Sequence, residues 1–255
     1  MNITVKNSAR NDLLPKLDAT NSRFIINYGG AGSGKSVAQA TIEVIKAWRK
    51  PKQRTLILRR YATTLKDSVI PLCKSILEKY SIPFEINKSD KEITLQNGSK
   101  LIFRGLDDVE KLKSIVDINR CWIEEASQID RPTSLEINRR LRGVNDIQIS
   151  YTFNPIDENH WLKADFVDKA RDNCTIFKTT YLDNKFLTDE DKQQLEDLKE
   201  YSPNDYRIYA LGEWGKYDNE SPFIWAFDEA KHVIESYDVN KNEPGDVGKL
   251  GKLLK

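Results

Sequence analysis

One glycine-rich stretch limits the possible folds of this chain more than any other feature. The segment GGAGSGKS (29–36) matches the pattern G-x-x-x-x-G-K-[ST], and its last two residues are Lys35 and Ser36. An apolar run, RFIINY (23–28), precedes this loop, and apolar residues at helical spacing follow it. A strand, a glycine loop and a helix in this order are the context that supports a phosphate-binding loop.

The residue types in this loop suit a nucleotide phosphate. Glycines let successive backbone N–H groups converge on phosphate oxygens where a Cβ would clash, and the following helix directs the positive end of its dipole at the same anion. Lys35 can reach the β- and γ-phosphates, and the Ser36 hydroxyl can ligate Mg²⁺. ATP and Mg²⁺ are therefore the expected cofactors, although a glycine-rich turn can also simply connect a strand to a helix. The expected nucleotide-binding residues are Gly29, Gly30, Ala31, Gly32, Ser33, Gly34, Lys35 and Ser36.

Short apolar runs alternate with helical patterns in the first part of the chain. Helical spacing occurs over 37–48 and 65–77, where Pro71 indicates a late start or a kink. The segment KEITLQNGSKLIFRG (91–105) is an expected hairpin that turns at Asn97 and Gly98. Strands that alternate with helices imply an α/β fold with a mostly parallel sheet. Further expected strands are TLILR (55–59), CWIEEA (121–126) and IQISYTFNP (147–155).

The pattern changes after Pro155. A helix-like and a strand-like segment follow, and then a polar helix that Thr188 is expected to cap. Beyond about Lys216 no regular pattern persists. The expected division is a core at 1–160, a small linker subdomain at 161–216 and a partly disordered tail at 217–255.

Composition by itself argues against several kinds of site and location, and it does not indicate nucleic-acid binding. The 255 residues carry a formal net charge of +1, which gives no sign of a nucleic-acid-binding protein. Three cysteines without a C-x-x-C pair, and two histidines, argue against a disulfide framework, a zinc ribbon and a histidine metal site. No apolar leader or stretch of about 18 apolar residues is present, so neither secretion nor membrane insertion is expected.

Two adjacent carboxylates, Glu124 and Glu125, end one of the expected strands. In one class of nucleotide hydrolases the first acid binds Mg²⁺ and the second polarises the attacking water. The expected metal ligands are therefore Ser36 and Glu124, and the expected catalytic base is Glu125. The alternative is favourable negative charge at the start of a helix near Ala126.

Polar residues end two other expected strands. Thr152 and Asn154 lie where open α/β sheets bind ligands, so they can sense the γ-phosphate and couple that state to another segment. The pair formed by Asn154 and Pro155 is also an ordinary turn signal. Arg59 and Arg60 end a strand at the same expected edge, which suggests contact with phosphate or with a second subunit.

Together these elements resemble the ATPase domain of bacteriophage terminase large subunits, the motors that package DNA into procapsids. The resemblance covers about residues 23–216 and depends on the order and spacing of its motifs. It implies a P-loop NTPase fold of the ASCE type, with 29–36 as the Walker A loop and Thr152 to Asn154 as the coupling motif. Glu124 then corresponds to the Walker B acid and Glu125 to the catalytic glutamate. The motifs are GGAGSGKS, FRGLDDVEKLKS, CWIEEASQI, RRLRG, YTFNP, NHWL, TTYLDNKFL and YALGEWG.

The resemblance also implies partners and a location. The expected partners are double-stranded DNA, the procapsid portal, a small terminase subunit and further copies of this chain. These copies are expected to form a ring, a pentamer, from subunits that are monomers in isolation. The expected location is the cytoplasm of an infected bacterial host.

Two features depart from this family pattern. Such motors usually carry a C-terminal nuclease with metal-binding aspartates, whereas Asp228, Asp238 and Asp246 are interpreted as surface acids, so no nuclease activity is expected. A basic residue from a neighbouring subunit would complete the site, and Lys113 and Arg139 are assigned to this catalytic role. Lys113 lacks the planar fork of arginine. Arg139, Arg140 and Arg142 precede Gly143, where they can equally offset the dipole at a helix C-terminus. The other candidates are Arg104 and Arg142.

Two other classes of protein use the same loop. A small-molecule kinase needs an acceptor pocket and a mobile basic lid, and no segment before Glu124 resembles such a lid. A helicase or recombination ATPase has a related core and remains the alternative. Because paired acids and the TFNP segment favour hydrolysis and coupling, the expected function is an ATP-hydrolysing motor domain that drives double-stranded DNA into procapsids.

Overall fold

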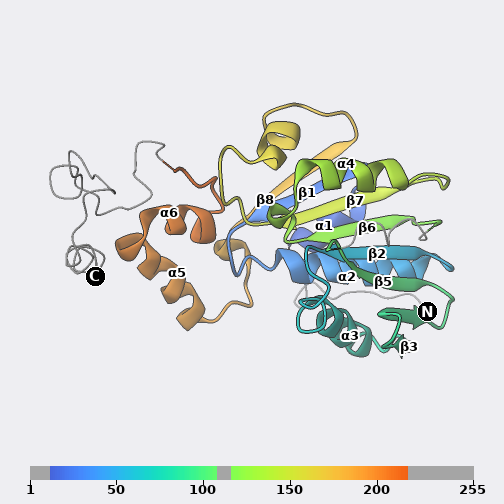
Figure 1. Ribbon diagram of the computed structural model, residues 1–255. Helices are drawn as coiled ribbons and strands as arrows, with labels where there is room; N and C mark the ends of the chain where they lie inside the picture. The colour runs from blue at the N-terminus through green and yellow to red at the C-terminus, as the bar shows by residue number, and fades with distance from the viewer. Residues whose placement is uncertain (1–11, 108–115, 218–255) are drawn as a thin grey trace, which may run out of the picture. The chain divides into compact units, whose positions relative to one another are not determined.

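The computed structural model describes residues 12–107 and 116–217, which contain an eight-stranded sheet in the order β3-β4-β5-β2-β6-β7-β1-β8 (Figure 1). All neighbours from β5 to β8 are parallel, whereas β3 and β4 are antiparallel to their neighbours. The predicted α/β class and mostly parallel sheet are confirmed. The strands are β1 (Phe24–Gly29), β2 (Arg54–Arg59), β3 (Phe84–Asn87), β4 (Glu92–Leu95), β5 (Lys100–Gly105), β6 (Arg120–Glu124), β7 (Gln148–Phe153) and β8 (Cys174–Thr179).

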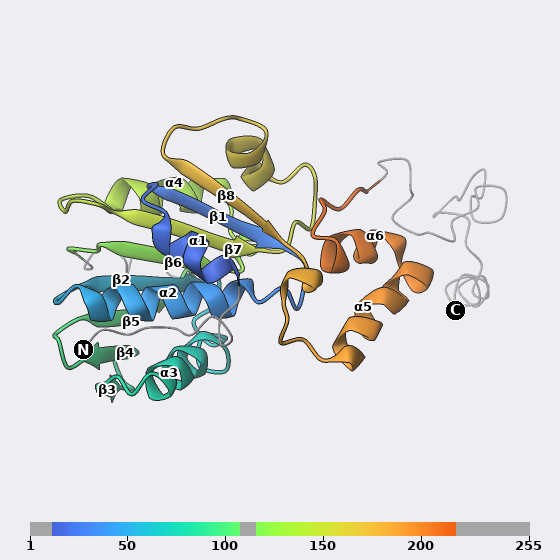
Figure 2. The same cartoon turned by 180° about the vertical axis from the view of Figure 1, so that it is seen from behind.

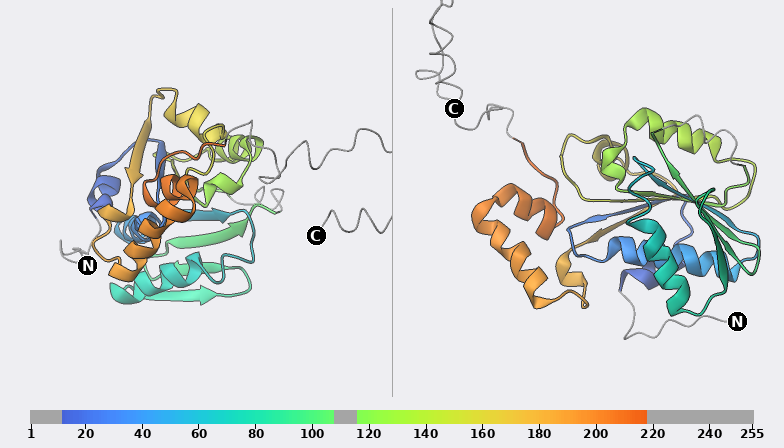
Figure 3. Two further views of the ribbon diagram at one scale, coloured as in Figure 1. Left: turned by 90° about the vertical axis from the view of Figure 1, so that its left-hand side faces the viewer. Right: turned by 60° about the horizontal axis from the view of Figure 1, so that its bottom comes forward.

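Helices cover both faces of the sheet. In Figures 1 and 3, α2 and α3 lie on one face and α4 lies on the other, and Figure 2 shows α1 beside α2. The helices are α1 (Leu13–Ala19), α2 (Lys35–Arg49), α3 (Val69–Lys79), α4 (Arg131–Arg140), α5 (Asp189–Tyr201) and α6 (Pro203–Asp205). Short 3₁₀ turns are η3 (Ala126–Gln128) and η5 (Tyr181–Asp183), and π-helical turns are η4 (Lys163–Val167) and η6 (Tyr206–Ala210). No helix among the described residues is long and apolar enough to cross a membrane.

The central strands are buried on both faces. Because successive side chains of a strand point to opposite faces, Leu56 and Leu58 pack with Ile137 of α4, whereas Ile57 packs with Val44 of α2. Continuous apolar runs of this kind are typical of parallel strands covered by helices. The alternation therefore places one hydrophobic core on each side of the sheet.

Parallel strands bring the site residues to one edge of the sheet. The register pairs Glu124 of β6 with Thr152 of β7, and Tyr28 of β1 with Phe153 of β7. The carboxyl ends of these strands therefore lie together, and the loops that follow them can share one ligand.

Several local predictions are confirmed. The hairpin of β4 and β5 turns around Asn97 and Gly98, where the Gly98 N–H donates to the Leu95 carbonyl at 2.9 Å. The helix α3 begins only at Val69, which places Pro71 in its first turn, where a missing N–H is tolerated. Thr188 caps α5 by accepting a hydrogen bond from the Asp191 N–H.

The segment 161–216, which is expected to be a small subdomain that completes the core domain, contributes one strand to the sheet. Its strand β8 pairs in parallel with β1, from Phe24 opposite Cys174 to Gly29 opposite Thr179, so this strand completes the sheet. Residue 160 is therefore not a boundary of the sheet, and the helix-like pattern after it forms only the π-helical turn η4. The helices α5 and α6 follow β8 and remain the candidate subdomain. The expected tail lies outside the described residues from residue 218 onward.

Candidate nucleotide-binding site

The predicted phosphate loop connects β1 to α2. Gly34, directly before the helix, has a φ of 78°, in the left-handed region that favours glycine. A Cβ on Gly30 would lie 2.5 Å from the Tyr209 carbonyl oxygen, so only glycine allows this approach of the two backbones. The first turn of α2 starts at Lys35. Its N-terminus presents backbone N–H groups toward any anion held by the loop.

Lys35 lies inside this loop, and its ammonium group donates to the Gly30 carbonyl oxygen at 2.9 Å. Burial lowers the pKa of Lys35 to about 8, whereas nearby Glu125 and Glu124 favour its charged form. A phosphate in the loop would act in the same direction as these carboxylates, because an opposite charge at close range stabilises the ammonium. Lys35 therefore fits the role of a phosphate-binding lysine.

Ser36 and Glu124 meet at the end of β6. The Ser36 hydroxyl donates to Oε1 of Glu124 at 3.4 Å, and Oε2 of Glu124 lies 2.9 Å from Nε of Arg59. Burial, followed by the charge of Glu125, raises the pKa of Glu124 to about 7, against the opposing influence of Arg59. A hydroxyl and a carboxylate oxygen are hard ligands of the kind that Mg²⁺ takes, so the two residues fit this metal.

Glu125 follows β6 directly and has a left-handed backbone, with φ 55° and ψ 47°. For a residue with a Cβ this conformation is strained by roughly 1–3 kcal/mol, and such residues concentrate at functional sites. A helical turn does begin at Ala126, as the alternative role for the two acids expects, but it is the single 3₁₀ turn η3, and Glu125 at its N-cap makes no side-chain capping hydrogen bond. The longer helix α4 is not the one that these acids precede. That helix begins at Arg131 and is capped by Asp130, whose Oδ1 accepts from the Thr133 N–H at 2.8 Å.

The two predicted coupling residues make different contacts. Thr152 is buried, and its hydroxyl oxygen accepts a hydrogen bond from Nε1 of Trp122 at 2.8 Å. Asn154 donates from its side-chain amide to the Gly29 carbonyl oxygen at 3.0 Å. Asn154 therefore ties the end of β7 to the first residue of the phosphate loop, whereas Thr152 braces β6 against β7.

The basic residues named from the sequence lie in different places. Arg59 joins the site through Glu124, and Arg60 donates to the Gln128 carbonyl oxygen at 2.6 Å. Arg104, near the end of β5, forms an ion pair with Glu92 at 3.1 Å. Lys113 lies outside the described residues.

The structure does not bring Arg139 or Arg142 to the loop of the same chain. The helix α4 runs back from the site edge, and Arg23, which precedes β1, donates to Oδ1 of Asn138 near its C-terminus at 2.9 Å. Arg139 is 73% exposed in its side chain and pairs with Glu136. Both arginines therefore lie toward the amino ends of the parallel strands, away from the phosphate loop.

Sequence reasoning missed the support that residues 179–212 give to the loop. The Gly30 N–H donates to the Thr179 carbonyl at 2.9 Å, and the Ala31 N–H donates to the Tyr209 carbonyl at 2.7 Å. The Asn184 side chain donates to the Gly32 carbonyl at 2.6 Å. The segments TTYLDNKFL and YALGEWG supply these residues, and their polar and glycine residues were the only sequence signal.

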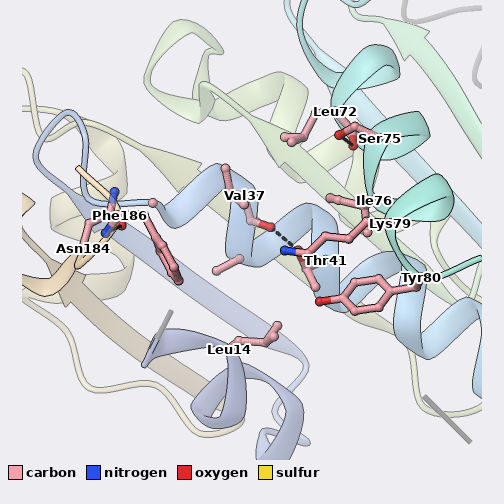
Figure 4. A pocket seen from close by; sticks show the side chains of 12 residues that line it. Leu14, Val37, Thr41, Leu72, Ser75, Ile76, Lys79, Tyr80, Asn184 and Phe186 are labelled. Atoms are coloured by element: carbon pink, nitrogen blue, oxygen red, sulfur yellow. Dashed lines mark hydrogen bonds between the residues drawn. The ribbon is translucent and has the colours of Figure 1, made fainter. Parts of the chain in front are cut away.

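A groove of about 290 Å³, also missed from the sequence, opens beside the loop (Figure 4). Gly34 lines it from the phosphate loop. Val37 lines it from α2, Leu14 from α1, and Phe186 from the segment before α5. Val37 and Phe186 are 52% and 54% exposed, which is high for apolar side chains next to a polar site. An apolar groove that adjoins a phosphate loop can accept the planar base of a nucleotide.

Comparisons with known proteins agree with this architecture. The model of the phage terminase large subunit family matches residues 21–213. The PBSX phage terminase large subunit of Bacillus subtilis is 30% identical over 209 residues, which are 73% of this chain and 48% of that protein. Among solved structures, the large terminase of a thermophilic bacteriophage in complex with ADP has a TM-score of 0.71 at 18% identity, over 88% of this chain and 57% of that chain. The ATPase domain of the large terminase of Thermus phage P74-26 has a TM-score of 0.61 at 12% identity, over 80% of this chain and 94% of that chain.

These likenesses differ in what they establish. The chain spans about half the length of the curated relative, and the structural matches, at less than 25% identity, establish the fold. The family model covers most of the chain from Asn21 to Glu213. The chain therefore belongs to the phage terminase large subunit family.

Proposed function

We propose that this chain is the ATP-hydrolysing motor domain of a terminase large subunit that drives double-stranded DNA into procapsids. The observation that carries the proposal is the meeting of Lys35, Ser36 and Glu124 at one edge of the sheet, with the strained Glu125 beside them. These residues come from two separate parts of the sequence, and each suits one step of ATP hydrolysis.

The loop residues 29–36 would hold the phosphates through their backbone N–H groups, and Lys35 would bind the β- and γ-phosphates. Ser36 and Glu124 would hold Mg²⁺, which when bound neutralises charge on the phosphates. The base would lie in the groove beside Val37, with Phe186 available for stacking. The large terminase of the thermophilic bacteriophage, whose fold is similar, was solved with ADP.

Glu125 would accept the proton of the attacking water. Its carboxylate lies near enough to Glu124 to raise the pKa of that group, and near enough to Lys35 to favour the charged form of the lysine. Both acids favour the charged form of Lys35. This positive charge would compensate the negative charge that develops on the phosphate. A basic residue of a neighbouring subunit, Lys113, Arg104, Arg139 or Arg142, would complete the site in an assembled ring.

Asn154 would carry the state of the site outward, because it contacts the phosphate loop from the end of β7. In this proposal the chain works in the host cytoplasm with double-stranded DNA, the procapsid portal and a small terminase subunit. Its net charge of +1 gives little non-specific attraction to DNA, so the isolated chain should bind duplex weakly and with strong salt dependence.

The experiment that tests the proposal measures phosphate release from ATP and Mg²⁺ with duplex DNA, single-stranded DNA or nucleosides. We expect turnover that duplex DNA stimulates and that Lys35→Ala abolishes. Lys50→Ala, an exposed lysine at the other end of the same helix, is the matched control and should retain activity. Stimulation by single strands alone would indicate a helicase, and transfer of phosphate to a nucleoside would indicate a kinase.

A further inference from the structure

A second groove lies away from the nucleotide site, between α3 and the antiparallel strands at the edge of the sheet. It has a volume of about 430 Å³. Its apolar lining includes Ile86 of the edge strand β3, which is 38% exposed. The other apolar residues that line this groove, called here the β3–β5 groove, are Ile70, Ile93 and Phe103.

The rim of the β3–β5 groove is basic. The single acid that lines it, Glu92, forms ion pairs with Lys100 at 3.2 Å and with Arg104 at 3.1 Å, so its charge is offset locally. A partner that fits must therefore offer acidic groups together with an apolar side chain. A DNA backbone offers charge alone, which leaves the apolar floor uncovered. The lysines of the rim are Lys66, Lys88, Lys91 and Lys74, the last of which also pairs with Glu78 at 3.5 Å.

The helix α5 of this same chain has these properties. Its sequence DEDKQQLEDLKEY holds six acidic side chains against two lysines, and none of its residues is fully buried. Glu190, Asp197 and Glu200 fall on one face, because residues three, seven or eleven apart share a side of a helix. Tyr201 falls on that face as well and is 82% exposed. A protruding tyrosine among acids complements an apolar floor with a lysine rim.

The helix cannot reach the groove of its own chain. The groove lies at the β3 edge of the sheet, whereas α5 follows β8, the strand at the opposite edge. Moreover, the Leu195 side chain lies 3.7 Å from where a Cβ on Gly32 would be, which keeps α5 beside its own phosphate loop. Contact between the two surfaces requires a second copy of the chain.

We propose that α5 of one copy docks in the β3–β5 groove of the next copy, with Tyr201 over the apolar floor and Glu190, Asp197 and Glu200 against the lysine rim. This assignment rests on the proposed function only in that the motor works as an assembly of copies. Two different surfaces at opposite edges make a head-to-tail contact, and such contacts close into rings when the rotation permits.

This docking places the next copy close to the nucleotide site. Leu195 points toward Gly32 and Asp197 lies on the opposite face of α5, so the helix separates its own phosphate loop from the neighbouring groove. The separation is one helix diameter, about 10 Å. Arg104, which is paired with the groove residue Glu92, comes to the same side of the contact.

The experiment measures self-association by sedimentation velocity with a non-hydrolysable ATP analogue and Mg²⁺. A groove variant carries Lys66→Glu and Lys88→Glu, and a helix variant carries Asp197→Lys and Glu200→Lys. Each variant alone should associate about tenfold more weakly, because two attractive contacts become repulsive. Mixing the two variants should restore association, since the reversed groove then meets the reversed helix. Combining all four substitutions in one chain should restore it as well.

Controls separate this proposal from folding defects and from the proposed function. Lys50→Glu with Lys52→Glu reverses two exposed charges away from both surfaces and should associate like the wild type. All variants should bind a fluorescent ATP analogue with wild-type affinity, which excludes a folding defect. If the wild type binds nucleotide but does not self-associate, the docking is wrong and the proposed ATPase function is unaffected. Three other outcomes would also overturn the docking. Both reversed variants associate as well as the wild type, the mixture and the combined variant fail to recover association, or the variants lose DNA binding instead of association.

Discussion

The side-chain amide of Asn154 lies 3.0 Å from the Gly29 carbonyl oxygen and donates a hydrogen bond to it, which joins the end of β7 to the start of the phosphate loop. The two residues are 125 positions apart in the sequence. Since the bond spans two strands that both end at the ligand edge, a displacement of either strand end reaches the other directly.

We predict that Asn154→Asp lowers the stimulation of ATP turnover by DNA several-fold and leaves nucleotide affinity within about threefold. The carboxylate keeps the size of the amide but has no N–H donor for Gly29, so a bond worth roughly 1 kcal/mol is lost. The measurement compares turnover with and without duplex DNA. Asn159→Asp, at an exposed position in the loop that follows β7, is the control. Equal stimulation in both variants would show that Asn154 has no coupling role.

We predict that Glu125→Gln binds ATP normally and hydrolyses it about 10²- to 10⁴-fold more slowly, because an amide cannot accept the proton of the attacking water. Equilibrium binding of a fluorescent ATP analogue and single-turnover hydrolysis separate the two effects. Near wild-type hydrolysis by this variant would remove Glu125 from the mechanism.

The backbone of Glu125 permits a separate stability test. The free energy of unfolding of Glu125→Gly, measured with urea, should exceed that of Glu125→Ala by about 1 kcal/mol, because glycine adopts the φ of 55° without strain. Both variants lack the carboxylate, so their difference reports the backbone alone. Equal stability of the two would mean that this position is not strained in solution.

The pKa of Glu124 predicts a pH dependence of stability. Its folded-state pKa of about 7 lies above the ordinary value of 4.5, so between these pH values the folded chain holds a proton that the unfolded chain has lost. Stability should therefore fall as pH rises from 5 to 7, by up to roughly 3 kcal/mol from this group. The pKa of Lys35 is lowered to about 8 from its ordinary value of 10.5, so between these pH values the unfolded chain holds a proton that the folded chain has lost. The contribution of Lys35 to stability therefore rises with pH between 8 and 10.5.

Urea unfolding without Mg²⁺ or nucleotide checks this prediction. Glu124→Gln should flatten the profile between pH 5 and 7, whereas Glu190→Gln, at an exposed position of α5, should leave it unchanged. A wild-type slope in the Glu124→Gln variant would show that another group causes the dependence.

Mixing subunits should reveal a basic residue that acts between copies. A chain that lacks Lys113, Arg104, Arg139 or Arg142 but retains Glu125 is combined with Glu125→Gln, which retains all four. Activity should return for one of the four pairs, because the basic residue of the Glu125→Gln subunit completes the active site of its neighbour, which retains Glu125. Such a residue is worth roughly 10³- to 10⁵-fold in GTPase systems. Additive inactivity of all four mixtures, with a rate per subunit independent of protein concentration, would indicate a self-contained ATPase.

The sequence predicted those elements whose ends are determined by residues nearby in the chain. Thr188 before a run of acids marks the start of α5, and Asn97 with Gly98 marks the turn between β4 and β5. The loop at 29–36 likewise identified its strand and helix, because glycine and lysine at that spacing have a specific physical use. Each of these features depends on contacts within about ten residues.

Features that depend on distant partners could not be predicted in this way. The edge strand β3 has mostly exposed side chains and no clear alternation, so only its pairing with β4 defines it. The strand β8 shows a local strand pattern, yet nothing in that pattern says that it pairs with β1, about 150 residues earlier. The hydrogen bond from Asn184 to Gly32 has the same origin, which is why the support of the phosphate loop was missed.

The chain that carries α5 leaves the phosphate loop at Thr179 and returns to it at Tyr209, so both of its ends are anchored to adjacent residues of one short turn. The segment from Thr179 to Tyr209 would therefore act as a lever arm that pivots at the phosphate loop. Its long arm, α5, extends about 20 Å, so a rotation of about 10° at the fulcrum would displace its tip by roughly 3 Å. A small rotation at the loop would thus become a much larger displacement at the far end of α5.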